Sequence, residues 1–244
     1  MEYNEDYGDR LTINVATGTA ATLTRMKTYI STTERMHLSS HGTWNSEEGS
    51  KITMYGGYLT HQEVSSWSLT GGICKFIYLS ACNSMGHNGI LDTDLANELR
   101  LRTSIEAVIG FKDVANILGA TLLSQSFWGF HVAYEYIGGI STATSYTNTL
   151  DRIQFKIDLI RLGGSITISV AIGYLVSLAM SGIGAGFISA VLSGIISLYL
   201  LGLLLDEVQA TLNSCELVGT NVPGLYWPSG GGGGGGKPPV DVID

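Results

Sequence analysis

Runs of basic residues are missing from this sequence, and charged residues are scarce overall. Lys and Arg total 13 against 21 Asp and Glu, which gives a net charge of −8. Because a nucleic-acid-binding surface needs clustered Lys and Arg, we expect no nucleic-acid partner. A hydrophobic fraction of 45% and a charged fraction of 14% also exclude a disordered chain.

Cysteine is scarce as well. Cys74, Cys82 and Cys215 are too few and too scattered for a disulfide framework or a Cys-based metal cluster. We therefore expect reduced thiols in a cytosol-like compartment, and neither a metal nor a cofactor. The N-terminus, MEYNEDYGDR, lacks the basic and apolar regions of a secretory signal, so we expect any targeting to depend on an internal segment.

Charged residues are absent between Arg161 and Asp206. This gap divides the chain into three predicted parts. Residues 1–160 are expected to form a water-soluble domain, residues 161–207 an apolar segment, and residues 208–244 a polar tail. Seven glycines, Gly230–Gly236, give that tail the composition of a flexible linker.

The apolar segment is expected to be a helical hairpin with arms near 165–180 and 187–205. Small residues recur at four-residue steps, as in helices that pack closely in lipid. One interpretation is a membrane-interacting hairpin, with the basic residues before it placing the soluble domain on the cytoplasmic side. The other is a hairpin buried in protein, as in a homo-oligomer.

Hydrophobic periodicity predicts alternating strands and helices in residues 1–160. Strands are expected at 11–15, 36–40, 76–80 and 107–110, and a hairpin near 51–57. Helices are expected at 20–30, 60–67, 95–101, 117–137 and 141–158, the second of them with a capping box formed by Thr60 and Glu63. This alternation is typical of an α/β domain with a mostly parallel sheet flanked by helices, followed here by the apolar α-helical hairpin.

Two of the predicted strands end in potentially reactive residues. One is followed by His41-Gly42 and the other by Ala81-Cys82. Open α/β sheets place functional residues beyond the carboxyl ends of their strands, so neighbouring strands would bring a base and a thiol into one cleft. His41 would take the proton of Cys82, and the N–H groups of Gly42 and Cys82 would form an oxyanion hole.

These blocks resemble the caspase-like cysteine peptidases of clan CD, most closely the CHAT and gingipain-type branch. The resemblance rests on the strand ending in His41-Gly42, on GYLTHQEVSSWSL (57–69), on FIYLSACNS (76–84) and on the helix-strand-helix run that follows. It implies a His41/Cys82 dyad that hydrolyses peptide bonds in a protein or peptide substrate. Asp92 and Asp94 are candidates for a pocket selecting basic residues, although both also fit as caps of the helix near Leu95.

The family usually begins with a strand and helix that this sequence lacks, so we expect that an N-terminal strand is missing or is supplied by a partner. A second functional hypothesis follows from this departure. The fold would then be a catalytically degenerate interaction module whose hairpin drives oligomerisation or membrane permeabilisation. His37 lies four residues before His41, but no third ligand is spaced to join them, so we expect a packed or solvated His37 rather than a metal ligand.

Overall fold

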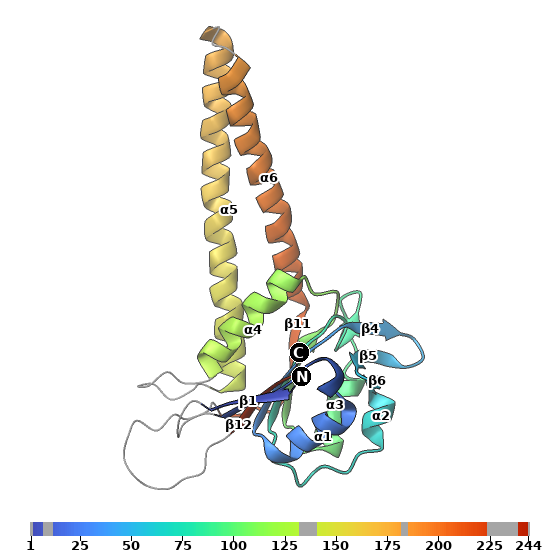
Figure 1. The fold of residues 1–244 in the computed structure, drawn as a ribbon. Coiled ribbons are helices and arrows are strands. Elements are labelled where there is room, and N and C mark those ends of the chain that lie inside the picture. Colours follow the sequence, from blue (N-terminus) through green and yellow to red (C-terminus); the bar gives the residue numbers. More distant parts are fainter. Residues whose placement is uncertain (1, 7–11, 132–140, 182–184, 224–238, 244) are drawn as a thin grey trace, which may run out of the picture.

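The fold is centred on one seven-stranded sheet, as seen in a computed structural model that describes residues 2–6, 12–131, 141–181, 185–223 and 239–243 (Figure 1). Its strand order is β1-β2-β12-β3-β7-β10-β11. The strands are β1 (Glu2–Asp6), β2 (Thr12–Ala16), β12 (Pro239–Ile243), β3 (Arg35–Ser39), β7 (Phe76–Ser80), β10 (Ala107–Phe111) and β11 (Cys215–Gly219). The five inner strands run parallel, and the edge strands β1 and β11 are antiparallel to their neighbours.

Helices cover both faces of this sheet. One face carries α1 (Leu23–Thr32), α2 (His61–Ser65) and α3 (Asp94–Arg102), and the other carries α4 (Ile117–His131) with the sheet-proximal parts of α5 (Thr142–Ser181) and α6 (Ala185–Ser214) (Figure 1). Strand β7 joins the two cores: Ile77 and Leu79 pack on the α1 side, whereas Phe76 and Tyr78 pack on the α4 side. A strand buried on both faces must be apolar throughout, as FIYL is. The predicted mostly parallel sheet flanked by helices is thus confirmed.

Smaller elements lie between β2 and α3 along the chain. A short 3-10 helix, Gly18–Ala20, precedes α1. A three-stranded antiparallel sheet contains β4 (Gly42–Asn45), β5 (Gly49–Met54) and β6 (Gly57–Thr60), and a two-stranded one contains β8 (Gly86–His87) and β9 (Ile90–Leu91). These pieces surround the carboxyl end of the large sheet.

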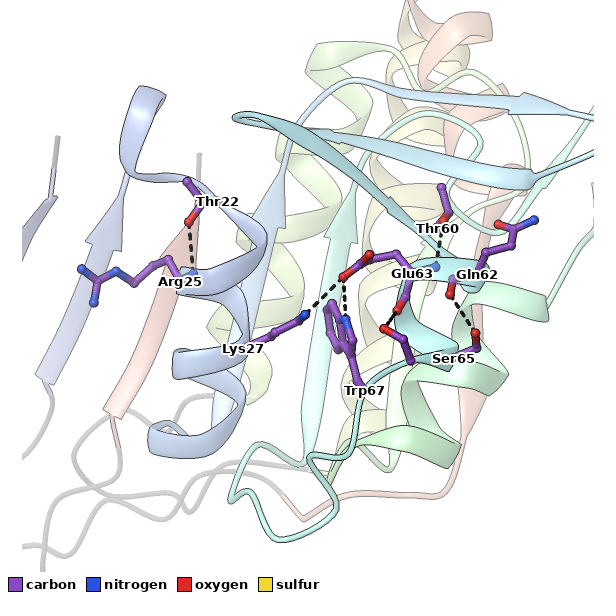
Figure 2. Close-up of polar contacts among 9 residues, drawn as sticks. Thr22, Arg25, Lys27, Thr60, Gln62, Glu63, Ser65 and Trp67 are labelled. Atoms are coloured by element: carbon purple, nitrogen blue, oxygen red, sulfur yellow. Dashed lines mark hydrogen bonds and ion pairs between the residues drawn. The ribbon is translucent and has the colours of Figure 1, made fainter.

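The predicted capping box at the start of α2 is formed only in part (Figure 2). Thr60 caps α2 by accepting a hydrogen bond from the Glu63 backbone N–H at 3.2 Å. The Glu63 carboxylate instead accepts from Lys27 Nζ at 3.2 Å and from the Trp67 indole N–H at 2.9 Å. These two hydrogen bonds, that of Trp67 first, lower the pKa of Glu63.

Most predicted elements are found within a few residues of their expected limits, and two elements differ from the prediction. Residues 2–6, for which the sequence predicts no helix or strand, form β1 by pairing with the antiparallel edge of β2. Helix α4 is described to His131, and the predicted remainder to 137 lies outside the described residues. The predicted helix 141–158 and the first hairpin arm are one continuous helix, α5.

The hairpin extends away from the sheet as two long helices (Figure 1). Arg161 and Asp206, the charged residues that flank the uncharged stretch, form an ion pair at 2.7 Å. Near this ion pair the hairpin exposes large apolar side chains, among them Phe155 at 67% and Tyr199 at 65% exposure. In the part of the chain that the structure describes, no helix is both long and apolar enough to cross a membrane.

Candidate active site

The register of β3 and β7 brings the two reactive residues to one edge of the sheet. Ser39 of β3 is paired with Ser80 of β7, and the Ser40 N–H donates to the Ser80 carbonyl at 3.3 Å. His41 and Cys82 each follow two residues after that last pair. Because the strands are parallel neighbours, both residues leave the sheet in the same direction and from adjacent positions.

Gly42 packs directly against the backbone of Cys82. A Cβ atom built on Gly42 would overlap the Cys82 carbonyl oxygen and lie 3.1 Å from the Cys82 nitrogen. Only glycine therefore fits here without displacing one of the two segments. This close approach links the residue after His41 to Cys82, across the ends of two strands.

Strand β5 holds the backbone of His41 from the other side. The Thr53 N–H donates to the His41 carbonyl at 2.8 Å, and the Ser40 hydroxyl donates to the Thr53 carbonyl at 2.5 Å. The bond between Thr53 and His41 lies beside the Gly42–Ile52 pair. Gly42 and Ile52 are therefore a non-hydrogen-bonded pair of the antiparallel ladder. The N–H of Gly42 consequently points away from β5.

Cys82 lies at the start of a tight turn that is bonded to the loop after β10. Asn83 has a positive φ of 51°, and its N–H donates to the Asp113 carbonyl at 3.0 Å. The Ser84 hydroxyl accepts from the Phe111 N–H at 2.9 Å. These bonds fix the turn that presents Cys82, since a non-glycine residue keeps a left-handed conformation only when its surroundings impose it.

The Cys82 side chain is half-buried and contacts the loop before α4. Its sulfur accepts a hydrogen bond from the Ala115 N–H at 3.4 Å, and the thiol donates to the Ala115 carbonyl at 3.6 Å. Among the described residues, no hydrogen bond joins this sulfur to His41, whose side chain is exposed. Cys74 and Cys215 are buried, and burial raises the pKa of Cys215 to about 12.

His41 and Cys82 line one cavity of about 480 Å³ at the carboxyl ends of β3 and β7. The remaining lining comes from Ser39, Ser40, Ser80 and Ala81 and from the α4 side, with Ala115, Ile117, Ala120 and Thr121. A hollow of this size, with a thiol and an imidazole at its wall, has room for a substrate side chain beside the sulfur.

The carboxylates proposed for substrate selection do not line this cavity. Asp92 Oδ2 accepts from the Trp44 indole N–H at 2.9 Å, and Oδ1 accepts from the Asp94 backbone N–H at 3.1 Å. Thr93, not either aspartate, occupies the N-cap position of α3, and its side chain makes no capping hydrogen bond. Asp92 therefore fixes Trp44, whose ring stacks on His87 at 4.9 Å between centroids.

His37 packs inside the α4 side of the sheet, one of the two environments expected for it. Its ring lies 5.2 Å from that of Tyr78 and 6.2 Å from that of Trp128, between centroids. Burial lowers the pKa of His37 to about 4, so the imidazole is neutral at physiological pH. Among the residues with described positions, no group of three His, Cys, Asp or Glu side chains could hold a metal ion.

Sequence reasoning missed the residues that hold the site in place. Ala115 acts through its backbone N–H and carbonyl, so its side chain carries no signal of the contact. Thr53 acts in the same way. The only available signal was the recurrence of short polar residues at the strand ends, in Ser39-Ser40 and Ser80.

A comparison with models of known protein families finds a match. The model of the CHAT domain family matches residues 5–117, a span that contains His41, Gly42 and Cys82. No curated protein matches this chain. The family match confirms the resemblance to caspase-like peptidases of clan CD.

Proposed function

We propose that this protein is a cysteine endopeptidase, because residues 5–117 are a CHAT domain of the caspase-like cysteine-peptidase type. Cys82 is the nucleophile and His41 the general base. The observation that carries the proposal is the β3–β7 register, which leaves His41 and Cys82 side by side at the wall of one cavity. Asp92, engaged by Trp44, has no part in this mechanism.

The reaction begins with transfer of the Cys82 proton to the His41 imidazole. The thiolate then attacks the carbonyl carbon of the scissile peptide bond, and the carbonyl oxygen becomes an oxyanion. The N–H groups of Gly42 and Cys82 stabilise that charge. Among the described residues, no turn or loop carbonyl accepts a hydrogen bond from either N–H. The C–N bond breaks as His41 protonates the leaving amine, and water, deprotonated by His41, hydrolyses the thioester and regenerates the thiol.

Two features support this assignment of roles. Cys82 is half-buried, so it is reachable while shielded from bulk water, and Ala115 holds the sulfur in place through two hydrogen bonds. In this mechanism the exposed His41 ring turns about its side-chain bonds toward the sulfur, while the hydrogen bond from Thr53 holds its backbone in place. Catalytic hydrogen bonds commonly tighten only when substrate is bound.

The test is cleavage of a mixed peptide library by the full chain under reducing conditions. Cys82→Ala and His41→Ala should each lower the rate at least about 10³-fold, because the two groups act as a unit. His61→Ala is the matched control, since His61 begins α2 and does not line the cavity. Cleavage that persists in Cys82→Ala would overturn the mechanism.

We also propose that the α5–α6 hairpin tethers the peptidase domain to a membrane or to further copies of the chain. The specific support is its exposed apolar surface, which includes Leu162 and Leu200 as well as Phe155 and Tyr199. Large apolar side chains exposed in this number on one part of a protein are typical of interaction sites. Co-flotation of the full chain with anionic liposomes, together with its oligomeric state without liposomes, tests the two modes.

These measurements, combined with assays of peptide cleavage and liposome leakage, separate the peptidase from a degenerate interaction module. If Cys82→Ala floats and assembles like the wild type and the wild type cleaves peptides, the hairpin serves an enzyme. If the wild type permeabilises liposomes and cleaves nothing, the interaction module is the better account. A monomeric wild type that fails to float would reject the tether.

A further inference from the structure

The described residues that line the cavity at Cys82 include no Asp, Glu, Lys or Arg. Its polar surface consists of hydroxyl groups from Ser39, Ser40, Ser80 and Thr121, and its apolar surface comes chiefly from Ile117 and small alanines. Of the lining residues whose positions the structure describes, only His41 could carry a positive charge, and in the mechanism above it is the base. No described Asp, Glu, Lys or Arg lines the hollow in which a substrate side chain would lie beside the sulfur.

A second hollow begins on the opposite face of the sheet and shares Ser39 and Ser40 with the first. Its volume is about 340 Å³, and its wall includes Leu38, Thr53, Met54 and Tyr55. In the described part of the chain, no Asp, Glu, Lys or Arg lines it either. The two hollows meet at the end of β3, so an extended peptide crossing this edge would meet uncharged surface on both sides.

Charged side chains in the loop before α4 and on α6 form contacts outside the two hollows. Lys112 forms an ion pair with Glu216, and Asp113 accepts a hydrogen bond from the Val114 N–H. Glu207 accepts from the Asn116 side chain at 3.0 Å. None of these side chains lines either hollow, so a charged substrate side chain placed there would lose water and gain no opposite charge.

We infer that the peptidase selects an uncharged side chain, aliphatic or hydroxyl-bearing, on the acyl side of the cleaved bond. This inference rests on the proposed function. In the thioester, the residue on the acyl side of the cleaved bond supplies the carbonyl carbon that is bonded to the Cys82 sulfur, so the hollow against the sulfur is assigned to its side chain. Ile117 and the alanines favour methyl and methylene groups through apolar burial, and the serine hydroxyls accommodate Thr or Ser.

The experiment is a peptide series that varies only the acyl-side residue, assayed with the full chain under reducing conditions. Leu, Met and Thr at this position should give a kcat/KM at least tenfold above Arg, Lys, Asp and Glu. The variant Thr121→Glu places a carboxylate on the α4 side of the cavity and should raise the kcat/KM of the Arg and Lys peptides relative to Leu. Gln125→Glu adds the same charge one turn along α4, outside the cavity, and should leave the preference unchanged.

The outcomes distinguish a failure of the proposed substrate preference from a failure of the proposed peptidase activity. Preferred cleavage after Arg, Lys, Asp or Glu by the wild type, abolished in Cys82→Ala, would overturn the specificity and keep the peptidase. An unchanged preference in Thr121→Glu would overturn the assignment of this hollow to the acyl residue. Absence of cleavage after every residue, with the protein folded, would reject the proposed function itself.

Discussion

The α-carbon of Gly42 lies against the backbone carbonyl of Cys82, with no space for a methyl group between them. Gly42→Ala should therefore separate the His41 and Cys82 segments, because neither backbone has a flexible end that can yield. We expect peptidase kcat/KM to fall about 10²-fold, as small misplacements of reacting groups do, and the free energy of unfolding to drop by about 1–3 kcal/mol.

Gly129→Ala is the matched control for that substitution. Gly129 lies in α4 with nothing within 4 Å of an added Cβ. Its replacement should leave activity intact and raise stability by about 0.5–1 kcal/mol. Wild-type kinetics and thermal unfolding in Gly42→Ala would contradict the close approach.

The three thiols should differ sharply in reactivity toward iodoacetamide. Cys82 is half-exposed, whereas Cys74 and Cys215 are buried and burial raises the pKa of Cys215 to about 12. Mass spectrometry of the native protein near pH 7.5 should detect one adduct, on Cys82, formed at least about tenfold faster than any other. Cys82→Ala should show none until denaturant is added, when two appear. Early modification of Cys215 would contradict its burial.

Glu63 should contribute stability in a pH-dependent way. Its pKa is lowered by hydrogen bonds from Trp67 and Lys27, so its contribution is present above the ordinary carboxyl pKa and is lost as pH falls through the folded-state pKa. Glu63→Gln should thus be less stable than the wild type at pH 7, and the difference should shrink below about pH 4.5. Urea unfolding from pH 7 to pH 3 measures this. The effect is small because the pair is more than a third exposed.

Strand β12 should stabilise the sheet through its backbone. Val242 is paired with Val15 of β2 on one side and with His37 of β3 on the other. Val242→Pro removes a donor from an inner strand and should cost about 3 kcal/mol. Val242→Ala keeps the N–H and should cost less, as urea unfolding of the two variants would show. Equal midpoints for Val242→Pro and the wild type would place 239–243 outside the sheet.

The sequence predicts the central strands well because burial on both faces leaves a continuous apolar run, as in Phe76–Ser80, whose limits match β7. It also predicts that His41 and Cys82 leave the sheet at one edge, since each follows a strand, and β3 and β7 are parallel neighbours. It does not predict β12, whose five residues begin with the second proline of a pair and lie just after a glycine run. Nor does it predict the role of Asp92, because the bond to Trp44 joins residues 48 positions apart through side chains.

The position of β12 also bears on how the chain reaches this fold. β2 and β3 are not neighbours in the sheet; each pairs with β12, which lies more than two hundred residues later in the chain than β2. Contacts between such distant segments form slowly, because a long loop must close before any of them is gained. Assembly of the β1–β2 edge is therefore expected to be the late, rate-limiting phase of refolding, and a transient species with two open strand edges is expected to precede it.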